Sequence, residues 1–360
     1  MSFRETFNRI KQNFYNEVNC IPSKFVRFKP YFLGLMKSVY VIITASSGIG
    51  KSRFTKWAYI FTPFQYVNDN PHLNLKLKIF YFSLEENKDK FIRSLISEQL
   101  YHRYDLVISP RELLDMDKTN SKMSEEILAA IESCEEYVDK LLEVVEVIDW
   151  IRNPFGIYKY VRAYAQANGK FYNKGEEVNI NIPGTSWDKY VPNDSDAYVA
   201  IITDHVSLLT PENGDSLWEC IRKFSSDYCL SMRDKFGYCI VNVQQQEAAK
   251  EKQEYTYKGQ SIESKLEPSL DGLGDNKTTQ RDADFVYGLF GPDRYEIEEH
   301  EGYNIVALQD NYRSLKLLKD RDGEPNVRCP LWFRGAINEF SELPPLEDFR
   351  NGFAKYSDYC

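Results

Sequence analysis

The chain has 360 residues, of which 42% are hydrophobic and 28% are charged, and its net charge is −9. These values are typical of a globular protein with a sizeable core, in one large domain or two modest ones. No run is long and apolar enough for a membrane span and the N-terminus lacks a signal-peptide core, so we expect a cytoplasmic protein. The acidic balance argues against a surface that coats nucleic acid broadly, but it is compatible with a narrow channel lined by a few basic loops.

The cysteines and histidines do not form a recognisable metal or disulfide framework. The seven cysteines are scattered without a CxxC pair, and the four histidines lack the spacing of a metal-binding motif. We therefore expect reduced, mostly buried thiols and no zinc site.

An amphipathic helix is predicted over residues 2–19. Its apolar residues recur at spacings of three and four, namely Phe3, Phe7, Ile10, Phe14 and Val18. With the linker that follows, residues 1–37 form an N-terminal segment that must pack on its own domain or on a neighbouring subunit.

From residue 38 the sequence alternates between apolar strands and helices, which is typical of a parallel sheet with crossover helices. The predicted strands are 39–45, 77–84, 144–149, 197–204, 238–243, 285–290 and 303–308, followed by a hairpin near 314–333. The predicted helices include 51–61, 88–101 and 217–235. We expect one domain over 38–345, followed by a C-terminal tail, 346–360.

Three segments interrupt the alternation. Residues 105–143 read as a helical insertion and 169–193 as an inserted hairpin. Residues 246–280 are polar and contain lysine and glycine, which indicates a loop.

The strongest motif is a glycine-containing loop between a predicted strand and a predicted helix. It comprises Ala45, Ser46, Ser47, Gly48, Ile49, Gly50, Lys51 and Ser52. This pattern is that of a P-loop, in which backbone N–H groups surround phosphates, the lysine reaches the β- and γ-phosphates and the serine hydroxyl coordinates Mg²⁺. We therefore predict an ATP-binding site with Mg²⁺.

Polar residues at three further strand ends are candidates for the same site. Glu85 could orient the attacking water and is preferred to Glu86, although two glutamates at a helix start are also ordinary. Asp204 ends an apolar strand, as a Mg²⁺-holding aspartate does, or it caps a helix. Gln245 could sense the γ-phosphate, or it is simply a polar strand exit.

The order of these motifs resembles the motor domain of DnaB-type replicative helicases, over roughly residues 25–345. The resemblance rests on the P-loop, on Ser83-Leu84-Glu85, on Asp204 and Gln245, on the segment 280–284 (QRDAD) before a strand, and on 319–323 (KDRDG) in a late hairpin. It implies an α/β, RecA-like P-loop NTPase core with a mostly parallel central sheet flanked by helices and a late antiparallel hairpin.

The resemblance also implies roles for residues. Glu85 is similar to the catalytic glutamate, Asp204 to the Mg²⁺-holding aspartate and Gln245 to the sensor. Lys319 and Arg321 resemble the residues that one subunit inserts into its neighbour's nucleotide site; without the other motifs they would read as a charged turn.

The family further implies an ATP hydrolase that forms a homo-oligomer, a hexameric ring around single-stranded DNA, in a bacterial or phage-infected cell. The DNA-binding candidates lie in or near the polar loop and are Lys250, Lys252, Lys258 and Lys277. Primase or a helicase loader would be a partner, although residues 1–37 are short beside the family's primase-binding helical domain. The compact form would suit a phage-encoded helicase.

Two other functions share the same ATPase motifs. A RecA-type recombinase would form a filament on DNA, but the hairpin at 319–323 argues against it. A P-loop ATPase that acts as a switch without nucleic acid is favoured by the acidic charge.

Overall fold

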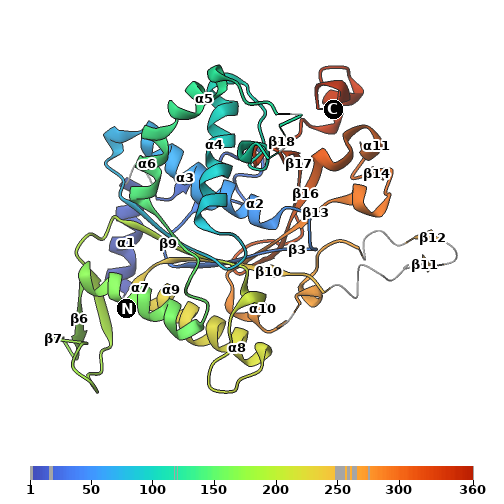
Figure 1. Cartoon of the computed structure of the whole chain (residues 1–360). Helices are drawn as coiled ribbons and strands as arrows, with labels where there is room; N and C mark the ends of the chain where they lie inside the picture. Colours follow the sequence, from blue (N-terminus) through green and yellow to red (C-terminus); the bar gives the residue numbers. More distant parts are fainter. Residues whose placement is uncertain are drawn as a thin grey trace.

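The computed structural model describes residues 3–15, 19–116, 118–119, 121–247, 256–257, 260–261, 266–274 and 276–359. Its centre is a nine-stranded sheet in the order β18-β17-β16-β13-β3-β10-β9-β4-β5 (Figure 1). The six strands from β13 to β5 run parallel, and β16, β17 and β18 are antiparallel. The expected mostly parallel α/β sheet with a late antiparallel hairpin is therefore confirmed.

Eight of the nine strands of this sheet agree closely with the predicted apolar runs and hairpin, whereas the ninth, β18, was not predicted. They are β3 (Val39–Ala45), β4 (Leu77–Ser83), β5 (Val145–Ile148), β9 (Tyr198–Asp204), β10 (Cys239–Gln245), β13 (Phe285–Phe290), β16 (Tyr312–Asp320), β17 (Arg328–Arg334) and β18 (Glu339–Glu342). Strands buried on both faces read as continuous apolar runs, which makes them recognisable in the sequence.

Helices cover both faces of the sheet (Figure 1). One face carries α2 (Lys51–Lys56), η1 (Trp57–Phe61), α3 (Thr62–Asp69), α4 (Lys88–Tyr104), α5 (Glu125–Glu132) and α6 (Glu135–Val144). The other carries α7 (Pro154–Ala167), α8 (Leu217–Lys223), η5 (Phe224–Cys229), α9 (Leu230–Phe236) and α10 (Thr279–Asp282). The predicted helix 51–61 thus extends to Asp69 through a π-helical turn.

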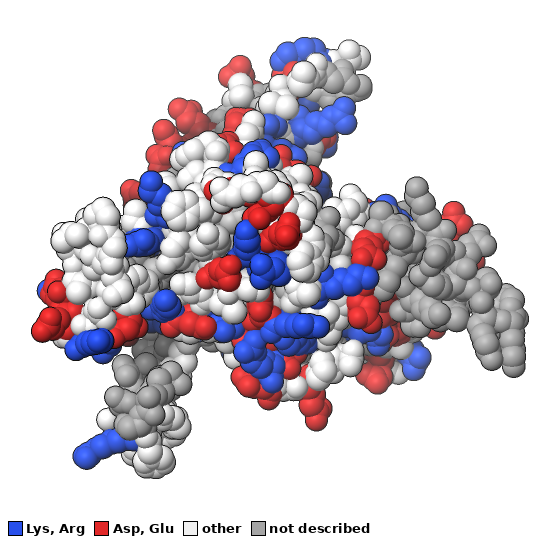
Figure 2. Space-filling model, turned by 90° about the horizontal axis from the view of Figure 1, so that it is seen from below, with Lys and Arg blue, Asp and Glu red and all other residues white. Residues whose placement is uncertain are grey.

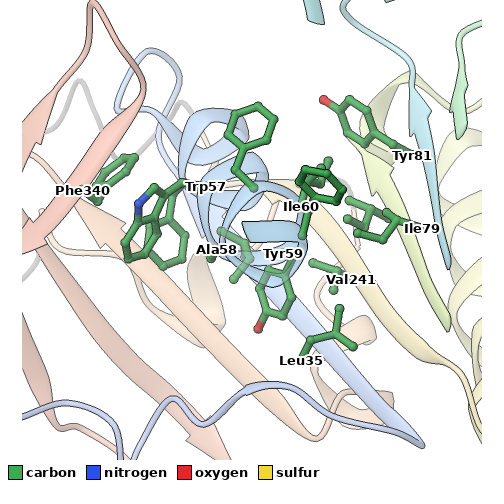
Figure 3. Packing of buried hydrophobic residues seen from close by; sticks show 14 of the residues in the cluster. Leu35, Trp57, Ala58, Tyr59, Ile60, Ile79, Tyr81, Val241 and Phe340 are labelled. Carbon is green, nitrogen blue, oxygen red and sulfur yellow. The ribbon is translucent and has the colours of Figure 1, made fainter. Parts of the chain in front are cut away.

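Alternate residues of each central strand belong to two separate cores. In β3, Val41 and Ile43 face the first core, whereas Tyr40 and Ile42 face the second. Figure 3 shows the first core, in which Trp57 packs on Phe340 of β18 and Tyr59, from the same helical run, points toward Leu35. This packing fixes the helical run after the P-loop against the sheet.

The two predicted insertions contain the expected kinds of element. Residues 105–143 include a short helix, η3 (Glu112–Leu114), with α5 and most of α6. Residues 169–193 form a small antiparallel sheet of β6 (Gly169–Asn173), β7 (Glu176–Val178) and β8 (Lys189–Pro192), which has one strand more than a hairpin.

The strand predicted at 303–308 is wrong. Only β15 (Tyr303–Asn304) is extended there, paired with β14 (Glu299–His300), and α11 (Ile305–Leu308) follows. The side chain of Asn304 accepts a hydrogen bond from the backbone N–H of Ala307, so a helix cap ends the strand.

The two ends of the chain differ in how they pack. α1 (Phe3–Tyr15) forms most of the helix expected over 2–19, and its apolar side chains Phe3, Phe7, Ile10 and Phe14 are exposed. Residue 2 and residues 16–18, which include Val18, lie outside the described residues. After it, β1 (Ile21–Pro22) pairs with β2 (Gly34–Leu35), and α12 (Leu346–Arg350) and η11 (Tyr356–Asp358) lie near the C-terminus. No described helix is long and apolar enough to cross a membrane.

Candidate nucleotide-binding site

The P-loop connects β3 to α2 at the carboxyl edge of the sheet. Gly48 and Gly50 have φ values of 78° and 106°, in the left-handed region that favours glycine. A Cβ on Gly50 would also lie 3.4 Å from the ring of Phe333. Lys51 is buried as the first residue of α2. The loop therefore has the backbone path that a phosphate-binding loop requires.

Two arginines outside the motif hold this loop. Arg313 of β16 is buried, and its Nε donates a hydrogen bond to the carbonyl oxygen of Ile49 at 2.8 Å. Arg294, in η9 (Pro292–Tyr295), donates to the carbonyl oxygen of Ser47. Because these carbonyls are occupied, the loop can present its N–H groups to a ligand. Sequence reasoning missed both residues, since they follow no local motif and are distant along the chain.

The predicted Mg²⁺ pair is brought into contact. Ser52 Oγ donates a hydrogen bond to Asp204 Oδ1 at 2.9 Å, and Tyr81 donates one to Asp204 Oδ2 at 3.0 Å. Burial raises the pKa of Asp204 to about 6, while Ser52, Lys56 and Tyr81 oppose that rise. A hydroxyl and a carboxylate oxygen are ligands of the hard kind that Mg²⁺ prefers, so these residues fit the ion.

Glu85 lies at the same edge because β4 and β9 pair in register, with Ser83 opposite Asp204. The Glu85 side chain is 56% exposed, and its Oε2 lies 4.0 Å from His205 Nε2. Glu86 instead forms an ion pair with the buried Lys56 at 2.7 Å. Of the two glutamates, Glu85 is therefore the one whose carboxylate faces solvent.

The glutamines after β10 divide between structure and site. Gln245 pairs with Ala45 in the sheet, directly beside the start of the P-loop. Gln244 is buried and donates to the carbonyl oxygens of Gly274 and Asn276. Gln246 donates to Thr44 Oγ1 at 3.0 Å. Alternate residues of a strand face opposite sides of the sheet. Gln244 and Gln246 therefore share one side, and Gln245 faces the other.

Lys319 and Arg321 are not brought to the P-loop of their own chain. Lys319 lies opposite Val286, near the start of β13. The start of β13 lies beside the start of β3, because Asp284 Oδ2 accepts a hydrogen bond from the backbone N–H of Tyr40. Ala45 follows Tyr40 by five residue steps along the strand, which is a distance of about 17 Å. Both cations therefore belong to the amino edge of the sheet, away from the P-loop.

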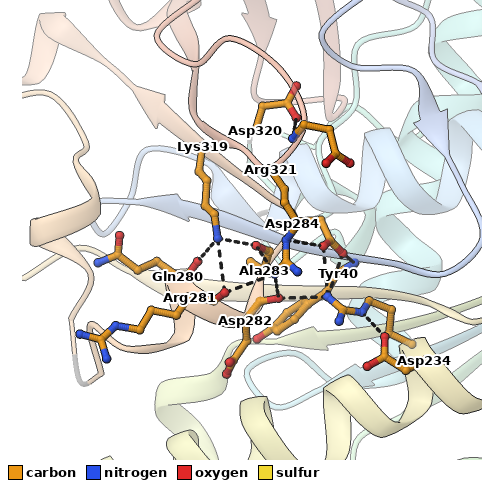
Figure 4. Close-up of polar contacts among 12 residues, drawn as sticks. Tyr40, Asp234, Gln280, Arg281, Asp282, Ala283, Asp284, Lys319, Asp320 and Arg321 are labelled. Carbon is orange, nitrogen blue, oxygen red and sulfur yellow. Dashed lines mark hydrogen bonds and ion pairs between the residues drawn. The ribbon is translucent and has the colours of Figure 1, made fainter.

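The segment before β13 surrounds Lys319 and Arg321, as Figure 4 shows. Lys319 Nζ donates to the carbonyl oxygens of Gln280 at 2.6 Å and Ala283 at 2.7 Å. Arg321 Nε lies 3.0 Å from Asp284 Oδ1, and the arginine side chain is 43% exposed. The two motifs 280–284 and 319–323 thus form one polar cluster on the surface.

The DNA-binding candidates receive little structural support. Lys250, Lys252 and Lys258 lie outside the described residues. Lys277 is described, and its Nζ lies 3.0 Å from Glu247 Oε1.

Comparison with known proteins identifies the fold. No protein-family model and no curated protein matches the chain. The solved ATPase domain of a phage protein matches with a TM-score of 0.65 and 18% identity, covering 95% of this chain and 99% of that one. A DnaB-like replicative helicase, studied with its interactions with primase, also matches with a TM-score of 0.65 and 18% identity; 96% of this chain and 67% of that one are covered. The chain therefore has the RecA-like fold of the ATPase domains of DnaB-like replicative helicases.

Proposed function

We propose that this chain is an ATP-dependent replicative DNA helicase, which hydrolyses ATP with Mg²⁺ at the interfaces of a hexameric ring and translocates on single-stranded DNA. The observation that carries the proposal is the separation of two sets of residues. Ser52, Asp204 and Glu85 meet at the carboxyl edge of the sheet, whereas Lys319 and Arg321 lie at the amino edge. A head-to-tail ring would bring the two sets from neighbouring subunits together.

The residues at the carboxyl edge have distinct roles in the proposed hydrolysis. The N–H groups of the P-loop and Lys51 bind the phosphates, and Ser52 and Asp204 hold the metal. Mg²⁺, when bound, would supply positive charge that stabilises the negative charge of the phosphates. Glu85 orients the attacking water and accepts its proton.

The remaining roles join hydrolysis to the neighbouring subunit. Gln245, beside the P-loop, contacts the γ-phosphate and relays its loss to the segment after β10. Arg321 and Lys319 of the adjacent subunit stabilise the charge that develops on the transferred phosphoryl group. Hydrolysis then depends on assembly.

The N-terminal helix supports an assembled state. Phe3, Phe7 and Phe14 of α1 are 85%, 52% and 80% exposed. An exposed apolar stripe of this kind marks a protein interface. We propose that α1 packs on the adjacent subunit, and that primase or a helicase loader acts on the assembled ring.

The charge distribution limits how DNA can be bound. Figure 2 shows lysines and arginines interspersed with acidic residues on the face seen from below. Such a face does not suit broad binding of the phosphate backbone. We therefore propose that DNA contacts come from the loop lysines Lys250, Lys252, Lys258 and Lys277 inside the ring.

A P-loop ATPase that acts as a switch without nucleic acid is the second candidate. The net charge of −9 and the interspersed charges favour it. The two functions differ in one measurable respect, since a switch would hydrolyse ATP at a rate that does not depend on DNA.

The test is the steady-state ATPase rate with and without single-stranded DNA, for wild type and Arg321→Ala. We expect DNA to stimulate wild type, and Arg321→Ala to lose most turnover while it still binds a fluorescent ATP analogue. An equal mixture of wild type and Arg321→Ala should lose more than half of the stimulated rate, because most mixed rings contain at least one defective interface. Arg111→Ala, an exposed arginine elsewhere, is the matched control and should behave as wild type.

Two results would overturn the proposal. A rate that is indifferent to DNA would leave the switch as the better function. Full turnover by Arg321→Ala would exclude the trans-acting arginine.

A further inference from the structure

A cluster of one histidine and two glutamates joins α4 to β18, on the face of the sheet that carries α2. Glu98 and His102 lie one turn apart on α4, and Glu339 is the first residue of β18. One ligand atom from each of the three lies within 4.8 Å of the others. His102 Nε2 is 3.3 Å from Glu339 Oε2 and 3.8 Å from Glu98 Oε1.

Glu98 is the most deeply buried member of this cluster. Its side chain is 3% exposed, and among the described residues its Oε2 atom has no hydrogen-bond partner. A buried carboxylate oxygen without a partner costs folding free energy and indicates an ion or a water. Since the other oxygen of Glu98 faces His102, the unpaired oxygen lies beside the same three-residue cluster.

A second cluster of the same composition gives the contrast. Glu267 also lies beside a histidine, His300, and a second glutamate, Glu301. There, however, Lys316 and Arg328 form ion pairs with Glu267 at 2.9 Å and 2.8 Å. That carboxylate is neutralised by the protein itself.

The first cluster differs from the second in its ion pairs. Within the described residues, neither Glu98 nor Glu339 forms an ion pair with a lysine or an arginine; their ionic partner is His102. A single imidazole nitrogen therefore faces two carboxyl groups.

We infer that Glu98, His102 and Glu339 bind a divalent transition-metal cation of the Zn²⁺ type. One imidazole nitrogen and two carboxylate oxygens are ligands that Zn²⁺ accepts, and a water would complete four-coordination. The cation gives the buried oxygen of Glu98 a partner. The 30% exposure of His102 leaves a path from solvent.

The position of the cluster indicates a structural ion. The same region holds a hydrogen bond from Arg334 of β17 to the hydroxyl of Tyr101 of α4. Phe340, next to Glu339, packs on Trp57 in the helical run after the P-loop. A cation would therefore fasten α4 to the antiparallel edge of the sheet, separately from the Ser52–Asp204 pair.

The histidine spacing in the sequence could not indicate this site. The site contains one histidine, His102; Glu98 lies four residues before it, and Glu339 comes from a distant part of the chain. The ligand set exists only after α4 and β18 pack together.

The test is a calorimetric titration of the full chain with Zn²⁺, after chelator treatment and in excess Mg²⁺ with reduced thiols. We expect one Zn²⁺ per chain, and at least tenfold weaker binding in His102→Gln, Glu98→Gln and Glu339→Gln. The controls are Glu301→Gln, from the second cluster, and His72→Gln, which should bind as wild type does. Equal Zn²⁺ binding by all variants, or none by wild type, would overturn the site.

A thermal melt separates loss of metal from loss of the fold. At a free Zn²⁺ concentration about a hundred times Kd, the Tm of wild type should rise by about 3 to 4 °C. Glu98→Gln replaces a buried carboxyl group, whose pKa is raised by burial, with a neutral group of similar size. The metal-free Tm of this variant should therefore be at least that of wild type, while the response to Zn²⁺ disappears. A full Zn²⁺ response in Glu98→Gln would show that the ion binds elsewhere.

Discussion

Lys56 Nζ lies 2.7 Å from Glu86 Oε2, and this ion pair joins the helix after the P-loop to the end of β4. The lysine side chain is 2% exposed and the glutamate side chain 13%. Lys90 contacts the other carboxylate oxygen at 3.0 Å, and Ser83 donates a hydrogen bond to the backbone oxygen of Glu86 at 2.6 Å. The turn that carries Glu85 is therefore held from several sides.

The first prediction concerns this pair. Lys56→Met should lower the free energy of unfolding by about 3 kcal/mol, because it leaves Glu86 partly buried without its closest cation. The ATPase rate should fall as well, since the turn that positions Glu85 is loosened. Denaturant unfolding and the steady-state rate are the measurements.

The double variant Lys56→Met, Glu86→Met is its control. An apolar pair of similar volume should restore stability to within about 1 kcal/mol of wild type. If the single variant is as stable as wild type, the pair does not hold the turn.

The second prediction concerns Tyr81, whose hydroxyl binds the carboxylate of Asp204. Mg²⁺ requires the ionised carboxylate, and the pKa of Asp204 is raised to about 6 by burial. The ATPase rate of wild type should therefore fall as the pH drops through about 6. Tyr81→Phe removes a donor that favours the ionised form, so this acid limb should move up by about one pH unit.

The same pKa has an opposite effect on stability. Because the pKa of Asp204 is higher in the folded chain, this residue favours folding below its unfolded value of 3.8, and the contribution is lost as the pH rises through about 6. The metal-free Tm at neutral pH should accordingly be higher in Asp204→Asn than in wild type.

Tyr59→Phe is the control for Tyr81→Phe, because Tyr59 is also a buried tyrosine. This variant should leave the acid limb of the ATPase rate unchanged.

Much of the site could be predicted because its residues follow strands along the chain. Apolar runs mark β3, β4, β9 and β10, and the carboxyl ends of parallel strands meet at one edge. The sequence alone therefore predicts that Ser52 and Asp204 lie at the same site.

The remainder could not be predicted because it depends on side chains from distant segments. Lys56 and Tyr81 read as core positions of a helix and a strand, and nothing local indicates that they meet Glu86 and Asp204. The error at 303–308 has a local cause, since a cap at Asn304 turns an apolar run into a helix.

The third prediction concerns Arg313, which holds the P-loop from β16. Its guanidinium donates to Ile49 O and to Asp310, and it lies over the ring of Phe333 at 4.8 Å. Lysine keeps the charge but cannot make these contacts at once. Arg313→Lys should weaken binding of an ATP analogue about tenfold, measured by fluorescence anisotropy.

A variant of an exposed arginine provides the comparison for Arg313. Arg350→Lys, in α12, should leave nucleotide affinity unchanged. Unaltered affinity in Arg313→Lys as well would mean that the P-loop keeps its shape without this side chain.

The last prediction separates the two carboxylates at the carboxyl edge of the sheet. Asp204 is buried and accepts a hydrogen bond from Ser52, whereas the side chain of Glu85 is exposed. A general base contributes roughly 10²–10⁴-fold to a rate, so Glu85→Gln should reduce kcat by about 100-fold or more while Mg²⁺-dependent nucleotide binding persists. Asp204→Asn should instead lose the dependence of binding on Mg²⁺. Single-turnover hydrolysis together with nucleotide titrations at varied Mg²⁺ distinguishes these effects. Near-normal turnover in Glu85→Gln would assign the proton transfer to another group, and His205, with Nε2 4.0 Å from Glu85, would be the next residue to substitute.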